Sequence, residues 1–257
     1  MSRRHLEFAC EGETLVGTLD EAPGADGLLI VTGGNEVRAG AFNGQAQLAA
    51  RIAEAGHPVF RFDRRGVGDS SGENRGFRES RPDIAAALTA FRTAHLTLDR
   101  IVAFGNCDAA SALMLASGAG CDALVLANPW TFEDSDQDTL PPAAIRARYA
   151  RKLSNPREWL RLASGQVDFG KLAKGLREAA SPPAPPSTLA QAIANNLARF
   201  GGPISILIAE RDRTGQAFIA SWDAQDPRIQ ICPSASHAFV EAPAREWLFS
   251  RLIAALV

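Results

Sequence analysis

Three residues have side chains, and an order along the chain, that are typical of a catalytic site. Cys107 lies in FGNCDAAS, Asp212 in AERDRTG and His237 in SASHAF, and each segment follows an apolar run. A thiol, an imidazole and a carboxylate are the groups required for nucleophilic catalysis with a base and an orienting acid. The sequence therefore predicts a Cys-His-Asp triad. The competing interpretation is a buried cysteine, an exposed loop histidine and a surface charge.

The residues around Cys107 fit a sharp turn between a strand and a helix. Gly105 and Ala109 stand two positions before and after Cys107, and a turn with a nucleophile at its tip needs small residues there. The turn would put Cys107 at the N-terminus of the next helix, where the helix dipole favours a thiolate. Asp108 opposes this effect by like-charge repulsion. A small residue in a tight turn, without chemistry, is the alternative.

The base and the acid are chosen by their positions relative to predicted strands. His237 lies between the last predicted strand and the last predicted helix, whereas the other three histidines fall in a strand or at helix ends. Open α/β sheets place functional groups in loops at the carboxyl ends of strands. Asp212 is favoured over Glu210 as the acid, because Glu210 still belongs to the strand end.

Acyl chemistry at Cys107 also requires donors for a developing oxyanion. The backbone N–H that follows the nucleophile, here that of Asp108, is one expected donor. The second is expected from the loop TGGNEVRAG after the strand at 27–33, either from Asn35 or from Gly34. A Gly-Gly pair also occurs in ordinary turns. No glycine-rich phosphate-binding pattern follows a strand, so nucleotide binding is not indicated.

Composition narrows the class of partner. The chain has 257 residues, of which 46% are hydrophobic and 22% charged, with a net charge of −2. Nothing suggests a nucleic acid or an anionic membrane as partner, since both require a concentrated basic face. No apolar run has the length of a signal peptide or a spanning helix, so we expect a cytoplasmic protein without membrane insertion. The oligomeric state stays open.

The four cysteines argue against a structural metal or disulfide framework. They are scattered along the chain, without the paired spacing of a zinc site or a disulfide-rich domain. Three of them are most simply small buried residues. We expect neither a metal ion nor an organic cofactor.

Short apolar segments alternate with helical patterns, which predicts the α/β class with a mostly parallel central sheet flanked by helices. The first two strands form a hairpin. The predicted strands span 5–10, 14–20, 27–33, 58–63, 100–105, 121–129, 202–210 and 228–234, and the clearest helices span 43–55, 83–95 and 245–256.

One segment, 133–200, interrupts this alternation because it contains no convincing strand. Its length exceeds that of a simple crossover. We interpret it as a helical cap inserted between two parts of a core domain, 1–132 and 201–257. Ordinary crossover helices are the alternative. Three aromatic residues are expected to line an apolar substrate pocket, or else to pack the cap onto the core. They are Trp130, Tyr149 and Trp159.

Six motifs together resemble a known family. They are GGNEVRAG, RFDRRGVGDSSG, FGNCDAAS, LVLANPW, AERDRTG and SASHAF, in this order. The set resembles the α/β-hydrolase superfamily and, more narrowly, the bacterial group called exosortase A system-associated hydrolase 1. The similarity covers nearly the whole chain. It implies an α/β-hydrolase fold and a link to exopolysaccharide and exosortase gene sets. The Gly-Gly-Asn-Glu loop departs from the His-Gly usual in the superfamily.

Together, the triad and the resemblance predict a hydrolase of a small-molecule ester, thioester or related acyl compound. Cys107 would form an acyl-thioester, His237 would move the proton and Asp212 would orient the imidazole. An acyltransferase with the same triad, and a non-catalytic small-molecule binding protein, are the alternatives.

Overall fold

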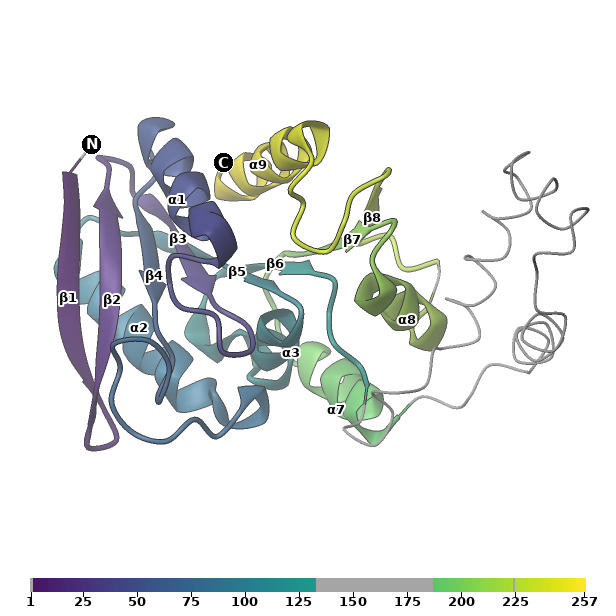
Figure 1. The fold of residues 1–257 in the computed structure, drawn as a ribbon, viewed down its shortest axis with the longest axis horizontal. Coiled ribbons are helices and arrows are strands. Elements are labelled where there is room, and N and C mark those ends of the chain that lie inside the picture. The colour runs from purple at the N-terminus through teal and green to yellow at the C-terminus, as the bar shows by residue number, and fades with distance from the viewer. Residues whose placement is uncertain (1, 133–186, 224) are drawn as a thin grey trace, which may run out of the picture.

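The computed structural model describes residues 2–132, 187–223 and 225–257, which form one eight-stranded sheet with helices on both faces (Figure 1). The strands are β1 (Ser2–Cys10), β2 (Glu13–Glu21), β3 (Asp26–Val31), β4 (Val59–Phe62), β5 (Arg100–Asn106), β6 (Ala123–Ala127), β7 (Ile204–Ala209) and β8 (Ile229–Cys232). The helices are α1 (Gly44–Glu54), α2 (Arg81–Ala94), α3 (Asp108–Leu115), α7 (Thr188–Leu197), α8 (Arg213–Ser221) and α9 (Ala242–Leu256).

The strand order across the sheet is β1-β2-β4-β3-β5-β6-β7-β8. The hairpin of β1 and β2 is antiparallel, and β2 pairs antiparallel with β4. Every other neighbouring pair is parallel. The predicted mostly parallel sheet, opened by a hairpin, is therefore confirmed. The parallel strands end at one common edge, which is where loops from different parts of the chain can meet.

Two layers of helices cover the sheet, and the strand sequences explain why. Leu28 and Ile30 of β3 belong to the core cluster that contains buried residues of α1 and α9, whereas Leu29 and Val31 belong to the cluster that contains buried residues of α2, α3, α7 and α8. Figure 1 shows α1 and α9 on one side of the sheet and α2, α3 and α7 on the other. A strand covered on both faces has no polar face, so its sequence is a continuous apolar run.

The helices α2 and α9 both begin earlier than the 83–95 and 245–256 predicted from apolar periodicity. Each carries a proline in its first turn, Pro82 in α2 and Pro243 in α9. Proline is tolerated there because the first N–H groups of a helix have no intrahelical partner. No helix in the described part of the chain is long and apolar enough to cross a membrane.

The segment 133–200, predicted to be a cap, is described only from Ser187 onward. Its described part contains α7, which contacts α3. The buried residues Leu189, Ile193 and Leu197 of α7 belong to the same core cluster as α3. This helix therefore packs against α3 as part of the core cluster on that face of the sheet. The remainder of the predicted cap lies outside the described residues.

Candidate active site

Cys107 forms the tip of a strained turn between β5 and α3. Its backbone has φ 62° and ψ −127°, which is unusual for a residue with a side chain and marks local strain. The Cys107 N–H donates to the carbonyl of Ala127 at 2.9 Å, and the Cys107 carbonyl accepts from the N–H of Trp130 at 3.3 Å. The turn is thus fixed to the chain that leaves β6, at the carboxyl edge of the sheet.

The small residues predicted around the turn have a steric reason. A Cβ atom added to Gly105 would lie 2.7 Å from the carbonyl carbon of Ala109. Real Cβ atoms do not approach backbone so closely, so only glycine allows α3 to start this near to β5. Ala109 is fully buried. The strand, turn and helix therefore form the elbow that the sequence predicts around Cys107.

His237 lies in the loop between β8 and α9, and two asparagines hold its backbone. Asn106 and Asn128 each donate from Nδ2 to the His237 carbonyl at 3.1 Å. Asn128 also donates to Oδ1 of Asn106, and its own Oδ1 accepts from the N–H of Ala209 at 2.8 Å. These bonds join the ends of β5, β6 and β7 to the loop that carries His237.

Sequence reasoning did not assign these two asparagines. The available signal is that each is a polar residue directly at the end of an apolar run, in FGNC and LANP. Asn128 is fully buried and has a positive φ of 43°. A buried amide in a left-handed backbone conformation has a specific hydrogen-bonding role, and here that role is to anchor the histidine loop.

Asp212 caps the N-terminus of α8 and also contacts His237. Its Oδ2 accepts from the N–H of Gly215 at 2.9 Å, and its Oδ1 lies 3.0 Å from Nδ1 of His237. The cap uses one carboxylate oxygen and leaves the other for the imidazole. Glu210 accepts instead from the N–H of Ser234 at 2.6 Å. Of the two candidate acids, Asp212 is the one that reaches the histidine.

The environment of His237 favours its protonated form. A hydrogen bond with Asp212 is the largest cause, and a hydrogen bond with the Cys107 side chain is the next; they raise the pKa of His237 to about 10. Burial opposes the shift, but less strongly. The imidazole therefore interacts with both other predicted triad residues and is positively charged at neutral pH.

The two candidates for the second oxyanion donor differ in their contacts. The N–H of Gly34 donates to both carboxylate oxygens of Asp108 at 2.8 Å. Asn35 is exposed, and its N–H has no acceptor within the described part of the chain. A donor already bound to a carboxylate is not free for a substrate oxygen. The geometry therefore leaves Asn35 as the candidate from this loop.

Trp130 is the predicted pocket residue that the structure describes. Its backbone N–H donates to the Cys107 carbonyl. Its ring packs edge-on against that of Phe132, with the ring centroids 4.8 Å apart. It is partly buried against the core. Trp130 therefore lies next to the elbow. Tyr149 and Trp159 lie outside the described residues.

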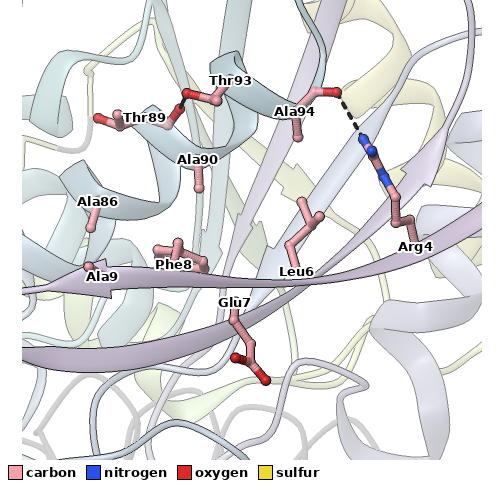
Figure 2. Close-up of a pocket in the computed structure, with 10 residues that line it drawn as sticks. All are labelled: Arg4, Leu6, Glu7, Phe8, Ala9, Ala86, Thr89, Ala90, Thr93 and Ala94. Carbon is pink, nitrogen blue, oxygen red and sulfur yellow. Dashed lines mark hydrogen bonds between the residues drawn. The ribbon is translucent and has the colours of Figure 1, made fainter.

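A groove of about 500 Å³ lies elsewhere, between β1 and α2 (Figure 2). Leu6 and Phe8 point toward α2, whereas Glu7 points away from it. Arg4 donates to the carbonyl of Ala94 at 2.9 Å across one end. The groove contains none of the predicted site residues and lies at the outer strand of the sheet. Among the described residues, no group of three or more His, Cys, Asp or Glu is arranged to hold a metal ion.

Comparison with known proteins agrees with this fold. The model of the alpha/beta hydrolase family matches residues 28–247. The chain therefore belongs to the alpha/beta hydrolase family, and the predicted α/β-hydrolase fold is confirmed. No curated protein matches the chain.

Solved structures of the same fold include three that cover nearly the whole chain. An esterase of Pyrococcus furiosus, Pf2001, is 17% identical with a TM-score of 0.62, over 99% of this chain and 89% of that one. The alpha/beta hydrolase GrgF of a Penicillium species is 18% identical with a TM-score of 0.64, over 100% and 98%. Est1E of Butyrivibrio proteoclasticus, solved with ferulic acid, is 14% identical with a TM-score of 0.60, over 98% and 99%. At such identities, the likeness concerns the fold.

Proposed function

We propose that the chain is a cysteine hydrolase that cleaves a small-molecule ester, thioester or related acyl compound. The observation that carries this proposal is the contact of the His237 imidazole with the Asp212 carboxylate, at 3.0 Å, and with the Cys107 side chain. The strained elbow at Cys107 supports the same proposal, because it presents one side chain at the carboxyl edge of the sheet. Membership of the alpha/beta hydrolase family supports the reaction class.

In the first half of the reaction, the Cys107 thiolate attacks the acyl carbonyl carbon. A C–S bond forms, and the carbonyl electrons move onto oxygen to give a tetrahedral oxyanion. When the oxyanion collapses, the bond to the leaving group breaks, and His237 donates its proton to the departing alkoxide or thiolate. The product is an acyl-thioester on Cys107 and a neutral imidazole.

The second half of the reaction uses water. The neutral His237 removes a proton from a water molecule, whose oxygen attacks the thioester carbonyl. Collapse of this second tetrahedral species breaks the C–S bond and restores the thiolate and the imidazolium. The His237 side chain is 43% exposed, so water can reach it. Asp212 holds the imidazole through Nδ1, which leaves Nε2 for the proton transfers.

Two backbone N–H groups are proposed to bind the oxyanion. The first belongs to Asp108, at the start of α3, where the N–H groups have no intrahelical partner. The second belongs to Asn35, which is exposed in the loop after β3. Trp130 is proposed to form one wall of the acyl pocket, because its backbone is bonded to Cys107. Tyr149 and Trp159 stay sequence-based proposals for the same pocket.

The narrower resemblance to exosortase A system-associated hydrolase 1 gives this proposal a setting. It rests on the motifs FGNCDAAS and LVLANPW together with the four others in the same order. We propose that the acyl substrate belongs to bacterial exopolysaccharide metabolism.

The test is the turnover of p-nitrophenyl esters and acyl thioesters of increasing chain length by the wild-type protein and Cys107→Ala. We expect wild-type turnover with a chain-length optimum, and loss of at least about 10³-fold in Cys107→Ala, as for removal of a catalytic nucleophile. Cys232→Ala is the matched control, because Cys232 is buried at the end of β8 and bonds to none of the three triad residues.

Equal turnover by the wild type and Cys107→Ala would remove Cys107 from the mechanism and contradict the proposal. Turnover that depends on an added alcohol and yields a new ester would identify an acyltransferase instead. Saturable binding of acyl compounds, with no turnover across the whole series, would indicate a binding protein.

A further inference from the structure

A buried arginine holds the peptide group between Gly34 and Asn35. Arg64 follows β4, and its side chain is only 3% exposed. Its Nη2 donates to the Gly34 carbonyl, and its Nη1 donates to Oγ of Ser80 at 2.9 Å. Its Nε has no acceptor among the described residues. The hydrogen bonds of the two terminal nitrogens therefore fix the orientation of the guanidinium group. One of them holds the Gly34 carbonyl in the loop after β3.

The bond to the Gly34 carbonyl also sets the direction of the next N–H. A trans peptide group is planar, and its C=O and N–H point in opposite directions. No cis peptide bond occurs in the described residues. Because Arg64 holds the carbonyl of Gly34, the N–H of Asn35 must point away from Arg64. A flip of this peptide would turn the Asn35 N–H toward the guanidinium group.

Asp108 fixes the other side of Gly34 and balances the charge of Arg64. Both carboxylate oxygens of Asp108 accept from the N–H of Gly34 at 2.8 Å, and Oδ2 lies 3.8 Å from Nη2 of Arg64. A Cβ atom at Gly33 would lie 2.3 Å from Oδ1 of Asp108, so glycine is needed for this approach. Asp108 directly follows Cys107, so the loop is tied to the elbow itself.

We propose that Arg64 is a positioning residue for the oxyanion hole: it holds the Gly34–Asn35 peptide so that the Asn35 N–H faces the substrate oxygen. This inference rests on the proposed cysteine hydrolase. Arg64 itself does not touch the substrate. Its contribution appears when negative charge develops on the acyl oxygen, so its loss should lower kcat more than it raises KM.

The test compares two reactions of the same thiolate. Acylation by a p-nitrophenyl ester passes through a tetrahedral oxyanion, whereas alkylation by iodoacetamide forms the S–C bond and expels iodide without one. Both rates are measured for wild type and Arg64→Met on the alkaline plateau of alkylation. There the thiolate is fully formed in each protein, so the lost positive charge does not enter the comparison.

We expect Arg64→Met to acylate about 10- to 100-fold more slowly than the wild type, somewhat less than the loss of a whole oxyanion donor. The alkylation rate should stay within about 3-fold, and Arg64→Lys should recover part of the acylation rate by donating to the Gly34 carbonyl. Arg65→Lys is the matched control. Arg65 is an adjacent buried arginine, but it bonds to Asp83 and not to the loop, so the ratio of its two rates should equal that of the wild type.

An equal fall of acylation and alkylation in Arg64→Met would overturn the inference, since Arg64 would then act on the thiolate or on folding. Unchanged acylation in Arg64→Met would overturn the inference as well. In either case, turnover of the esters by the wild type would leave the proposed function intact. A wild-type protein that no ester of the series acylates would overturn both the proposed function and this inference. Thermal unfolding of each variant confirms that the measured protein is folded.

Discussion

The environment of His237 favours its protonated form, and this bears on the nucleophile that we propose. A serine hydroxyl must lose its proton to a neutral imidazole, whereas a thiolate is stabilised by an imidazolium. The contact with Asp212 is the larger cause of the raised pKa of His237, and the contact with Cys107 is the second. The residue at the elbow and the charge of its partner are therefore chemically matched.

The first prediction concerns Cys107→Ser assayed with an alkyl ester, whose alkoxide leaving group needs a proton. In the wild type, activity should fall as His237 loses its proton near pH 10. The serine variant needs the neutral imidazole, so its activity should rise with pH as His237 loses its proton, and lie at least about 10²-fold lower at pH 7. This rise should occur below pH 10, because the variant lacks the Cys107 contact that raises the pKa of His237. Rates from pH 5 to pH 11 test this. Parallel profiles for the two proteins would contradict a protonated His237 as the partner of Cys107.

The second prediction concerns Asp212→Asn. Asparagine caps a helix as well as aspartate does, so the thermal stability contributed by α8 should change little. The variant removes the largest cause of the raised pKa of His237. The alkaline limb of the pH–rate profile should therefore move down from about 10 toward 6.5, the ordinary histidine value. An unmoved limb in a folded variant would show that Asp212 does not control His237.

The elements that carry the predicted triad are joined by hydrogen bonds as well as by packing. Cys107 lies between β5 and α3, Asp212 caps the N-terminus of α8, and His237 lies in the loop before α9. Asn128 connects them, because its side chain bonds to Asn106 and to the backbone of Ala209 and His237. A buried amide with all of these partners fixes the relative positions of three strand ends.

The third prediction concerns the hydrogen bonds of the Asn128 side chain. Asn128→Asp keeps the acceptor for the Ala209 N–H but replaces the donor that faces the His237 carbonyl with an oxygen. We expect a loss of about 1–3 kcal/mol in the free energy of unfolding, from the two lost bonds that Asn128 donates to Asn106 and His237 and from the new repulsion between oxygens. Urea denaturation measures it. Asn195→Asp, at an exposed position of α7, is the control and should change stability by well under 1 kcal/mol. Similar losses in the two variants would contradict a specific role for Asn128.

Local elements of the site could be predicted from the sequence, whereas its long-range contacts could not. The buried strands and the elbow are local patterns, since continuous apolar runs and the small residues around Cys107 are visible within a few positions. The contacts of Arg64 with Gly34 and of Asn128 with His237 join residues 30 and 109 positions apart. No local periodicity encodes such a bond. The sequence therefore predicts a triad and its order, while the groups that contact the predicted triad residues and their loops emerge only from the fold.

For the whole molecule, the raised pKa of His237 links the site to stability. The folded-state pKa of about 10 exceeds the unfolded value of about 6.5. Folding is therefore favoured by the protonated histidine. This stabilisation is fully present below about pH 6.5 and is lost as the pH rises through about 10.

The fourth prediction uses this linkage. At pH 6, the free energy of unfolding of the wild type should exceed that of His237→Gln by about 1 kcal/mol. This expected difference is small because the His237 side chain is 43% exposed, and solvent screens its interactions. The difference should vanish at pH 10.5. Chemical denaturation of both proteins at the two pH values tests this. A difference that grows with pH would contradict the assigned direction of the pKa shift.

The central claim is a covalent acyl-enzyme on Cys107, and intact-protein mass spectrometry tests it most directly. Wild type and Cys107→Ala are exposed briefly to a p-nitrophenyl ester and quenched in acid, which preserves a thioester. We predict one acyl mass addition in the wild type, located on the peptide with Cys107, and none in the variant. An addition of equal extent in both proteins, or wild-type turnover with the acyl group located on another residue, would contradict the account.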